Sequence, residues 1–212
     1  MRYTTMITSK PKFCELAIAL LPTPEIEQEA IRLNKQLEHA LIDCPNKINL
    51  IHISLFQGRF RESQFEKIVE SLKQIAELTS SFRIELDSKL TEACGNLFWN
   101  AKLQSQLFDL HKQVVAAISP YRDGILPVFV DCYPKLSKDK QQFIDDYGTP
   151  HVFRNFFPHI TVYYNIDPSK INCAKTIKPQ KHFSFFTNKL IVGRIGYDGN
   201  LEEIYCEFDL KV

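Results

Sequence analysis

Two short stretches decide how this sequence folds: Ile51-His52-Ile53-Ser54-Leu55 and Phe157-Pro158-His159-Ile160-Thr161-Val162. Each places a histidine two residues before a hydroxyl side chain, with apolar residues between and beside them. This alternation is typical of a β-strand with only one face buried. Because strand side chains alternate between faces, the imidazole and hydroxyl of each stretch are predicted to share one face, while the apolar residues point into a core.

The flanking sequence predicts an alternation of strands and helices. Thr23 and Pro24 form a helix start, and prolines and glycines separate the apolar runs. Strands are expected at residues 13–21, 49–56, 82–90, 96–100, 124–130, 156–164, 182–195 and 201–210, with Gly58 closing the second of them and a turn at 197–200 joining the last two. Helices are expected from Pro24 to just before Pro45 and at residues 63–78, 102–118 and 137–147.

The expected elements run in the same order in both halves of the chain. The first half has a strand from residue 13, a helix and then the strand with His52. The second half is expected to repeat this with a strand at 124–130, a helix and then the strand with His159. Since no low-complexity linker divides the halves, one domain of two packed lobes spanning residues 1–212 is expected, with residues 1–12 as a flexible tail.

Composition restricts the class of protein. The 212 residues are 44% hydrophobic and 24% charged, with a net charge of +1, which argues against a surface that coats long RNA or DNA. No apolar run approaches the roughly 20 residues of a membrane span. The cysteines have no zinc-binding spacing and are expected to be reduced thiols in a cytoplasmic protein. They are Cys14, Cys44, Cys94, Cys132, Cys173 and Cys206.

A histidine and a hydroxyl on one face suit the chemistry of a phosphate ester. One neutral imidazole can accept a proton from water while a protonated one donates a proton to the leaving oxygen. The hydroxyls of Ser54 and Thr161 can donate hydrogen bonds to phosphate oxygens. A single such triplet is common by chance in strands, whereas two at matching places in a repeat favour a shared catalytic site.

Other side chains near the motifs are candidates for substrate binding. Strict alternation places Phe56, Phe157 and Tyr163 on the same face as the histidines, where they would stack on a base or ribose or else form packing between the lobes. Arg154 is a candidate phosphate ligand, with an ordinary surface arginine as the alternative. His39 and His111 fall on predicted helices and are expected at the surface or at its edge.

The two motifs resemble those of the 2H phosphoesterase superfamily, which includes bacterial 2′–5′ RNA ligase-like proteins and cyclic phosphodiesterases. The second motif is the closer match because that family often has a proline directly before its second histidine. The order of elements over residues 13–210 is also similar. The resemblance implies an α+β fold of two pseudo-two-fold symmetric lobes, with antiparallel sheets lining a central groove and helices outside. It maps the catalytic pair onto His52 and His159, and the phosphate-contacting hydroxyls onto Ser54 and Thr161.

The resemblance implies a phosphoesterase that needs neither metal nor cofactor and acts as a monomer, without a membrane or an obligate protein partner. Its substrates would be 2′,3′-cyclic phosphates, 2′–5′ linked nucleotides or RNA ends, in RNA processing. One alternative is a non-catalytic RNA- or nucleotide-binding module on the same fold. A metal-dependent hydrolase is disfavoured because no carboxylates lie near either motif in sequence. The sequence leaves open which histidine is the base.

Overall fold

The computed structural model describes residues 12–41, 50–93, 95–128, 130, 136–164, 166–174, 176–196 and 199–211. The expected tail lies outside these ranges except for Lys12, and so do Cys44, Cys94 and Cys132. The strands are β1 Phe13–Leu20, β2 Ile53–Arg61, β3 Phe82–Ala93, β4 Asn96–Ala101, β5 His159–Tyr163, β6 Ser184–Thr187, β7 Lys189–Ile195 and β8 Leu201–Asp209. The helices are α1 Pro24–Leu41, α2 Phe65–Leu78, α3 Ser105–Ile118, α4 Lys138–Tyr147 and the short α5 Ile171–Ala174.

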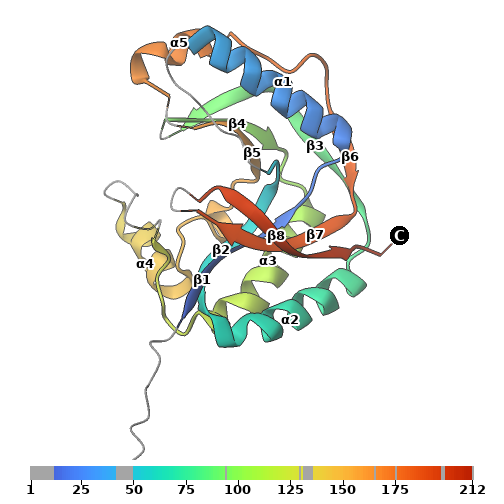
Figure 1. The fold of residues 1–212 in the computed structure, drawn as a ribbon, viewed down its shortest axis with the longest axis vertical. Coiled ribbons are helices and arrows are strands. Elements are labelled where there is room, and N and C mark those ends of the chain that lie inside the picture. The colour runs from blue at the N-terminus through green and yellow to red at the C-terminus, as the bar shows by residue number, and fades with distance from the viewer. Residues whose placement is uncertain are drawn as a thin grey trace, which may run out of the picture.

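The described strands form two antiparallel sheets of four strands each (Figure 1). The first has the order β2-β1-β7-β8 and the second the order β5-β4-β3-β6. The strand that carries a histidine motif lies at the edge of its sheet in both cases. This architecture confirms the predicted α+β fold of two lobes.

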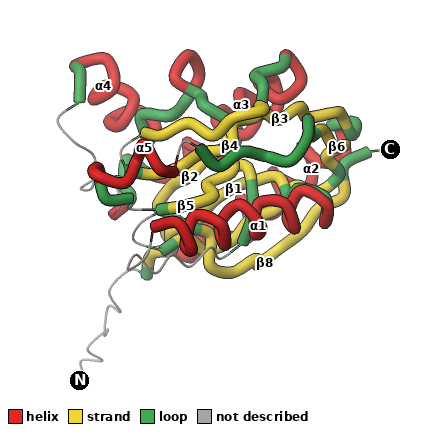
Figure 2. The backbone as a smooth tube through the Cα atoms, turned by 90° about the horizontal axis from the view of Figure 1, so that it is seen from above, coloured by secondary structure: helices red, strands yellow, loops and turns green. Residues whose placement is uncertain are grey.

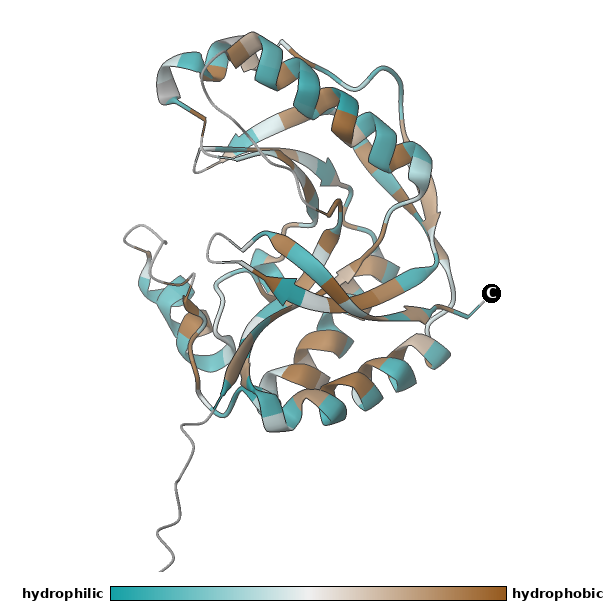
Figure 3. Cartoon of the chain, in the orientation of Figure 1, coloured by the Kyte–Doolittle hydropathy of each residue, from teal (hydrophilic) through white to brown (hydrophobic). Residues whose placement is uncertain are grey.

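Helices cover the outer side of each sheet. α1 packs against β5, whereas α3 packs against β2 and α2 against β7 and β8. α1 buries Ile26, Ala30, Leu33 and Leu37, a stripe at helical spacing. Figure 3 shows hydrophobic residues on the side of α2 that faces the sheet and hydrophilic ones on the side that faces away. α4 lies at the periphery in both views of the chain (Figures 1 and 2).

The repeated unit is a central strand, a helix and an edge strand, as β1-α1-β2 in one half and β4-α3-β5 in the other. In both units the helix covers the sheet of the other unit, because α1 packs on β5 and α3 on β2. A repeat that ends on each histidine strand was therefore predicted correctly, but the strand and the helix assigned to its second copy were wrong. That copy consists of β4, α3 and β5, and not of residues 124–130 and α4 before β5.

The strand predicted at residues 124–130 is wrong for the described residues 124–128, which form no strand. Asp123 and Gly124 both have positive φ values, 52° and 69°, so the chain turns sharply instead of extending. The buried Arg122 side chain then fixes the turn by donating to the carbonyls of Ile125 and Asp146.

The single strand predicted at residues 182–195 is two strands in different sheets. β6 pairs with β3, and β7 pairs with β1 after the break at Asn188. The apolar residues continue through the break because both parts bury side chains in the same hydrophobic core. The remaining predicted strands and helices are confirmed within the described residues, with shifts of up to about five residues at their ends. Residues 197 and 198 of the predicted turn, and the predicted end of the first helix before Pro45, lie outside the described residues.

Candidate active site

The two histidine motifs meet because their edge strands are neighbours. β2 and β5 are in contact with each other across the boundary between the sheets. His52 directly precedes β2, and His159 is the first residue of β5. The rings are near enough for a positive charge on His52 to lower the pKa of His159. The fold thus brings together the two side chains that are 107 positions apart in the sequence.

Both imidazoles are held in the same way. Nδ1 of His52 lies 2.7 Å from the carbonyl oxygen of Leu50, and Nδ1 of His159 lies 2.7 Å from that of Phe157. A carbonyl can only accept, so Nδ1 carries the proton and donates it in each ring. The proton at Nε2 is therefore the one that each ring gains or loses, which is the arrangement that acid–base catalysis requires.

The hydroxyl of each motif lies on the same face as its histidine, as predicted. Ser54 Oγ is 3.1 Å from Nε2 of His52, close enough for the serine hydroxyl to donate to the neutral ring. Thr161 lies opposite Phe98 and His159 opposite Asn100, on the face of the sheet away from the core. Within the described residues, Nε2 of His159 and the hydroxyl of Thr161 have no hydrogen-bond partner, so both remain available to a ligand.

Burial keeps both rings neutral at neutral pH. It lowers the pKa of His52 below its ordinary value, although the hydrogen bond to Leu50 opposes the change. Burial, together with the smaller effects of positive charge on His151 and His52, lowers the pKa of His159 to about 4. A bound phosphate would reverse this trend, because an anion stabilises the imidazolium form.

A β-bulge directly follows the hydroxyl in both motif strands. On β2 the partners of Ile18 and Ala19 are Phe56 and Ser54, so Leu55 is the extra residue. On β5 the partners of Leu97 and Phe98 are Tyr163 and Thr161, so the extra residue there is the one between them. A bulge shifts every later side chain to the other face.

The bulges overturn two predicted positions. Phe56 and Tyr163 were expected on the catalytic face, but both lie in the hydrophobic core, 2% and 0% exposed. Their places on the catalytic side are taken by the next residues, Gln57 and Tyr164. Gln57 donates from Nε2 to Ser54 Oγ at 3.3 Å, which confirms the side on which it lies. β2 also continues past Gly58, which was expected to end it.

Aromatic rings border His159. The Phe157 ring is 43% exposed and its centre lies 5.3 Å from that of the imidazole. The Phe98 ring is closer, with a ring-to-ring distance of 4.1 Å to His159, and it also contacts the Phe157 ring. Phe98 was missed in the sequence because its contact with His159 depends on the pairing of β4 with β5. Residues 96–100 read as a short apolar strand, and nothing in them shows which strand they pair with.

Arg154 is directed toward α4. Its guanidinium forms an ion pair with Asp139 at 2.8 Å and lies over the ring of Phe143. The side chain is exposed, and its contacts are with α4 and not with either motif.

A buried histidine links the segments that carry the two motifs. His111 on α3 was expected at the surface or at its edge, yet it is 0% exposed. Its Nδ1 donates to the carbonyl of the bulge residue Leu55 at 2.8 Å, and its Nε2 accepts from the backbone N–H of Phe153 at 2.9 Å. The ring also stacks on Phe156 at 3.8 Å. Phe153 has a φ of 51°, an unfavourable conformation that this bond helps to hold.

No group of three or more histidine, cysteine or acidic side chains within the described ranges is arranged to hold a metal ion. The described thiols of Cys14 and Cys206 are free. None of the helices described is both long and apolar enough to cross a membrane.

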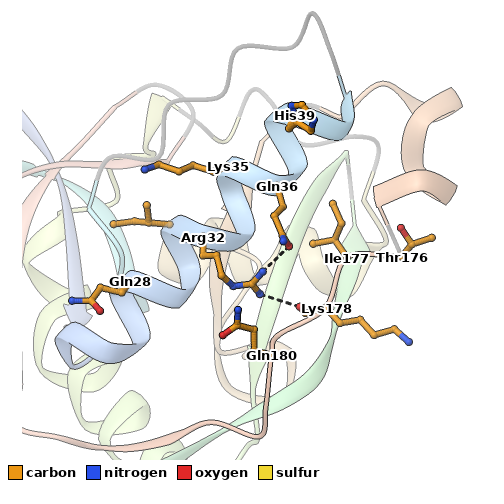
Figure 4. A pocket seen from close by; sticks show the side chains of 10 residues that line it. Gln28, Arg32, Lys35, Gln36, His39, Thr176, Ile177, Lys178 and Gln180 are labelled. Carbon is orange, nitrogen blue, oxygen red and sulfur yellow. Dashed lines mark hydrogen bonds between the residues drawn. The ribbon is translucent and has the colours of Figure 1, made fainter.

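A cleft of 980 Å³ lies between α1 and residues 176–180 (Figure 4). Basic side chains, among them Lys35, His39 and Lys178, line it. It is on the side of the second sheet that α1 covers, whereas His159 projects from the other side. The cleft is therefore separate from the histidine pair.

Solved structures of other proteins share this arrangement of two antiparallel sheets with helices on their outer sides. Escherichia coli LigT in complex with NADP+ shares it, with a TM-score of 0.59 and 12% identity over 96% of this chain and 100% of that chain. LigT complexed with 3′-AMP gives a TM-score of 0.60 at 12% identity, over 95% of this chain and 100% of that one. TT0787 of Thermus thermophilus gives 0.62 at 14% identity, over 93% and 98%. No protein-family model and no curated protein matches the sequence.

Proposed function

We propose that this protein is a metal-independent phosphoesterase that acts on 2′,3′-cyclic phosphates or on 2′–5′ linked nucleotides and RNA ends. The observation that supports the proposal most directly is the matched pair of imidazoles. Each has its Nδ1 proton bonded to the carbonyl two residues earlier, and each has a hydroxyl two residues later on the same face. Two such groups at the contact between two edge strands can act on one phosphorus centre from both sides.

In the proposed reaction the neutral ring of one histidine accepts a proton from water at Nε2, and the water oxygen attacks phosphorus. The other ring, protonated at Nε2, donates that proton to the departing ribose oxygen. The hydroxyls of Ser54 and Thr161 donate to the non-bridging phosphate oxygens, where negative charge increases in the transition state. The carbonyls of Leu50 and Phe157 keep both rings in the productive tautomer and stabilise whichever ring is cationic.

The second lobe offers a surface for the base or ribose of a nucleotide. The half-exposed ring of Phe157 lies beside His159, where a flat group attached to the reacting phosphate would be placed. Stacking on an aromatic ring contributes about 1–3 kcal/mol per base. Solved relatives of the same fold hold 3′-AMP and ATP, which agrees with a nucleotide substrate. The proposal assigns no contact to Arg154, whose charge is paired with that of Asp139.

A substrate panel tests the proposal. Nucleoside 2′,3′-cyclic phosphates, 2′–5′ and 3′–5′ dinucleotides and RNA with a cyclic phosphate end are incubated with the protein, with and without EDTA. We expect turnover of the cyclic or 2′–5′ substrates, unchanged by EDTA, and none with His52→Ala. The position of the phosphate in the product identifies the bond that breaks. Tight nucleotide binding without turnover of any substrate would instead indicate the binding module.

The pH optimum set by the free protein is expected to lie below the ordinary pKa of histidine. The rate is highest between the two apparent pKa values of the histidine pair, and burial lowers both of them. The profile of kcat/KM is therefore expected to peak below pH 6.5, the ordinary histidine pKa. The profile of kcat should peak at higher pH, because the bound phosphate raises the pKa of the protonated ring. Initial rates from pH 4 to 9 at constant ionic strength check this, and a kcat/KM maximum above pH 8 would contradict it.

A further inference from the structure

The side chains that the two bulges turn toward the catalytic side reach the same part of the molecule. Gln57 and Tyr164 each lie five positions after the histidine of their motif. Gln57 Nε2 donates to the carbonyl of Gly199 at 3.0 Å, and the Tyr164 hydroxyl donates to Oδ1 of Asn200 at 3.1 Å. Gly199 and Asn200 end the turn between β7 and β8, so one hairpin binds a side chain from each motif strand.

In the first motif a chain of hydrogen bonds connects Gly199, through Gln57 and Ser54, to the imidazole of His52. The amide of Gln57 donates one hydrogen to Gly199 and the other to Ser54 Oγ at 3.3 Å. Since that oxygen already accepts from Gln57, its own proton is directed to Nε2 of His52, 3.1 Å away. The serine hydroxyl is thereby held in one orientation before any substrate binds.

The second contact crosses between the sheets. Tyr164 directly follows β5 of the second sheet, whereas Asn200 belongs to the β7–β8 hairpin of the first. Asn200 is only 6% exposed, and its carbonyl accepts from the backbone N–H of Gly196. Gly199 in turn donates to the carbonyl of Gly196, so the end of the hairpin is itself held by backbone bonds. Gln57 and Tyr164 are therefore bonded to two consecutive residues, Gly199 and Asn200, whose backbone is itself held by Gly196.

We propose that Gln57 is a positioning residue that orients the hydroxyl of Ser54 and the ring of His52, and that the end of the β7–β8 hairpin anchors it together with Tyr164. The hairpin thereby sets the position of the first motif relative to the second. This inference rests on the proposed function for its kinetic consequence, but the orientation of Ser54 and His52 can be measured without turnover.

Gln57→Met tests the positioning role because methionine keeps the length of glutamine and removes the amide donors. With a substrate that the panel identifies, kcat is expected to fall about tenfold with KM changed less than twofold, since a small displacement of a catalytic group costs rate more than binding. Tyr164→Phe is expected to lower kcat in the same way. Gln74→Met is the matched control, because Gln74 bonds only to Glu70 on the exposed side of α2 and its replacement should leave kcat unchanged.

The double variant distinguishes one shared anchor from two separate contacts. If both residues act through the hairpin, the fold-decrease in kcat of the double variant is smaller than the product of the fold-decreases of the two single variants. One substitution then already removes the effect of the shared anchor. Losses that simply multiply would overturn the shared anchor.

A measurement of the His52 ring by NMR is independent of catalysis. In the wild-type protein the hydroxyl of Ser54 stabilises the neutral ring; in Gln57→Met that hydroxyl is free to turn away, so the pKa of His52 should rise by about 0.5. The pKa of His159 should stay the same. An unchanged His52 pKa together with wild-type kcat would refute the proposal. A rise of that pKa in a protein that turns over no substrate would support the positioning of His52 while the proposed function fails.

Discussion

Replacing His159 with alanine is expected to lower kcat by about 10³-fold on any substrate that the protein hydrolyses. General acid–base catalysis by one side chain contributes about 10²–10⁴ to a rate. Alanine removes Nε2 and leaves nothing on β5 that can exchange a proton with the reacting oxygen. The effect on KM should be small, because Thr161 and Phe157 remain to hold the phosphate and the base. Single-turnover rates with enzyme in excess measure the loss in the chemical step directly.

The fold is expected to tolerate this change. His159 lies on the face of the sheet away from the core, and its only bond within the described residues is to the carbonyl of Phe157. The melting temperature of His159→Ala should therefore be within a few degrees of that of the wild type. His182→Ala, a change of an exposed histidine away from both motifs, serves as the control. Wild-type turnover by a correctly folded His159→Ala protein would refute the two-histidine mechanism.

A loss of about 3 kcal/mol of folding stability is expected between pH 6.5 and pH 4 from His111 alone. Burial lowers the pKa of this ring to about 4, from 6.5 in the unfolded chain. Above pH 6.5 the ring is neutral in both states and contributes no pH dependence. As the pH falls below 6.5 the unfolded chain takes up the proton and the folded protein does not, so unfolding becomes more favourable. The penalty is complete near pH 4, where the folded protein is also protonated.

His111→Gln separates this contribution from those of the other histidines. Glutamine does not titrate, so the stability of the variant should fall by about 3 kcal/mol less over the same pH interval. At pH 7.5 the variant should be about 1 kcal/mol less stable, because its amide does not replace the ring that stacks on Phe156. Urea unfolding at several pH values measures both effects, with the exposed His39→Gln as control. Equal pH dependence in His111→Gln and the wild type would refute the assignment.

The sequence predicted which side chains share a face with the histidine of each motif as far as the bulge, and no farther. Alternation of side chains is a property of the strand itself, so it correctly paired His52 with Ser54 and His159 with Thr161. A bulge depends on which residues of the neighbouring strand are paired, and nothing in the apolar run of Leu55 and Phe56 distinguishes a bulged strand from a regular one. The sequence therefore placed Phe56 where Gln57 lies.

Two further differences have the same origin in long-range pairing. The break at Asn188 divides an apolar stretch between two sheets, and a window of sequence cannot show that its two parts pair with different strands. The second copy of the repeat begins at β4. The helix of each unit covers the sheet of the other unit, so the order of strands and helices along the chain does not show which of them form one unit. Local patterns predicted which segments are helices and which are strands. Which strands pair with one another depends on contacts between segments that are distant in the sequence.

The order β2-β1-β7-β8 has a consequence for how the protein is made. Leu20 on β1 pairs with Leu190 on β7, so the first sheet cannot be completed until the ribosome has synthesised nearly all of the described chain. Until then β1 and β2 can pair only with each other, and the edge of β1 that later binds β7 stays open, a state that exposes backbone donors and acceptors to other chains. Pairings so distant in sequence also slow folding. Expression at lower temperature, or with chaperones that shield open strand edges, should therefore raise the soluble yield.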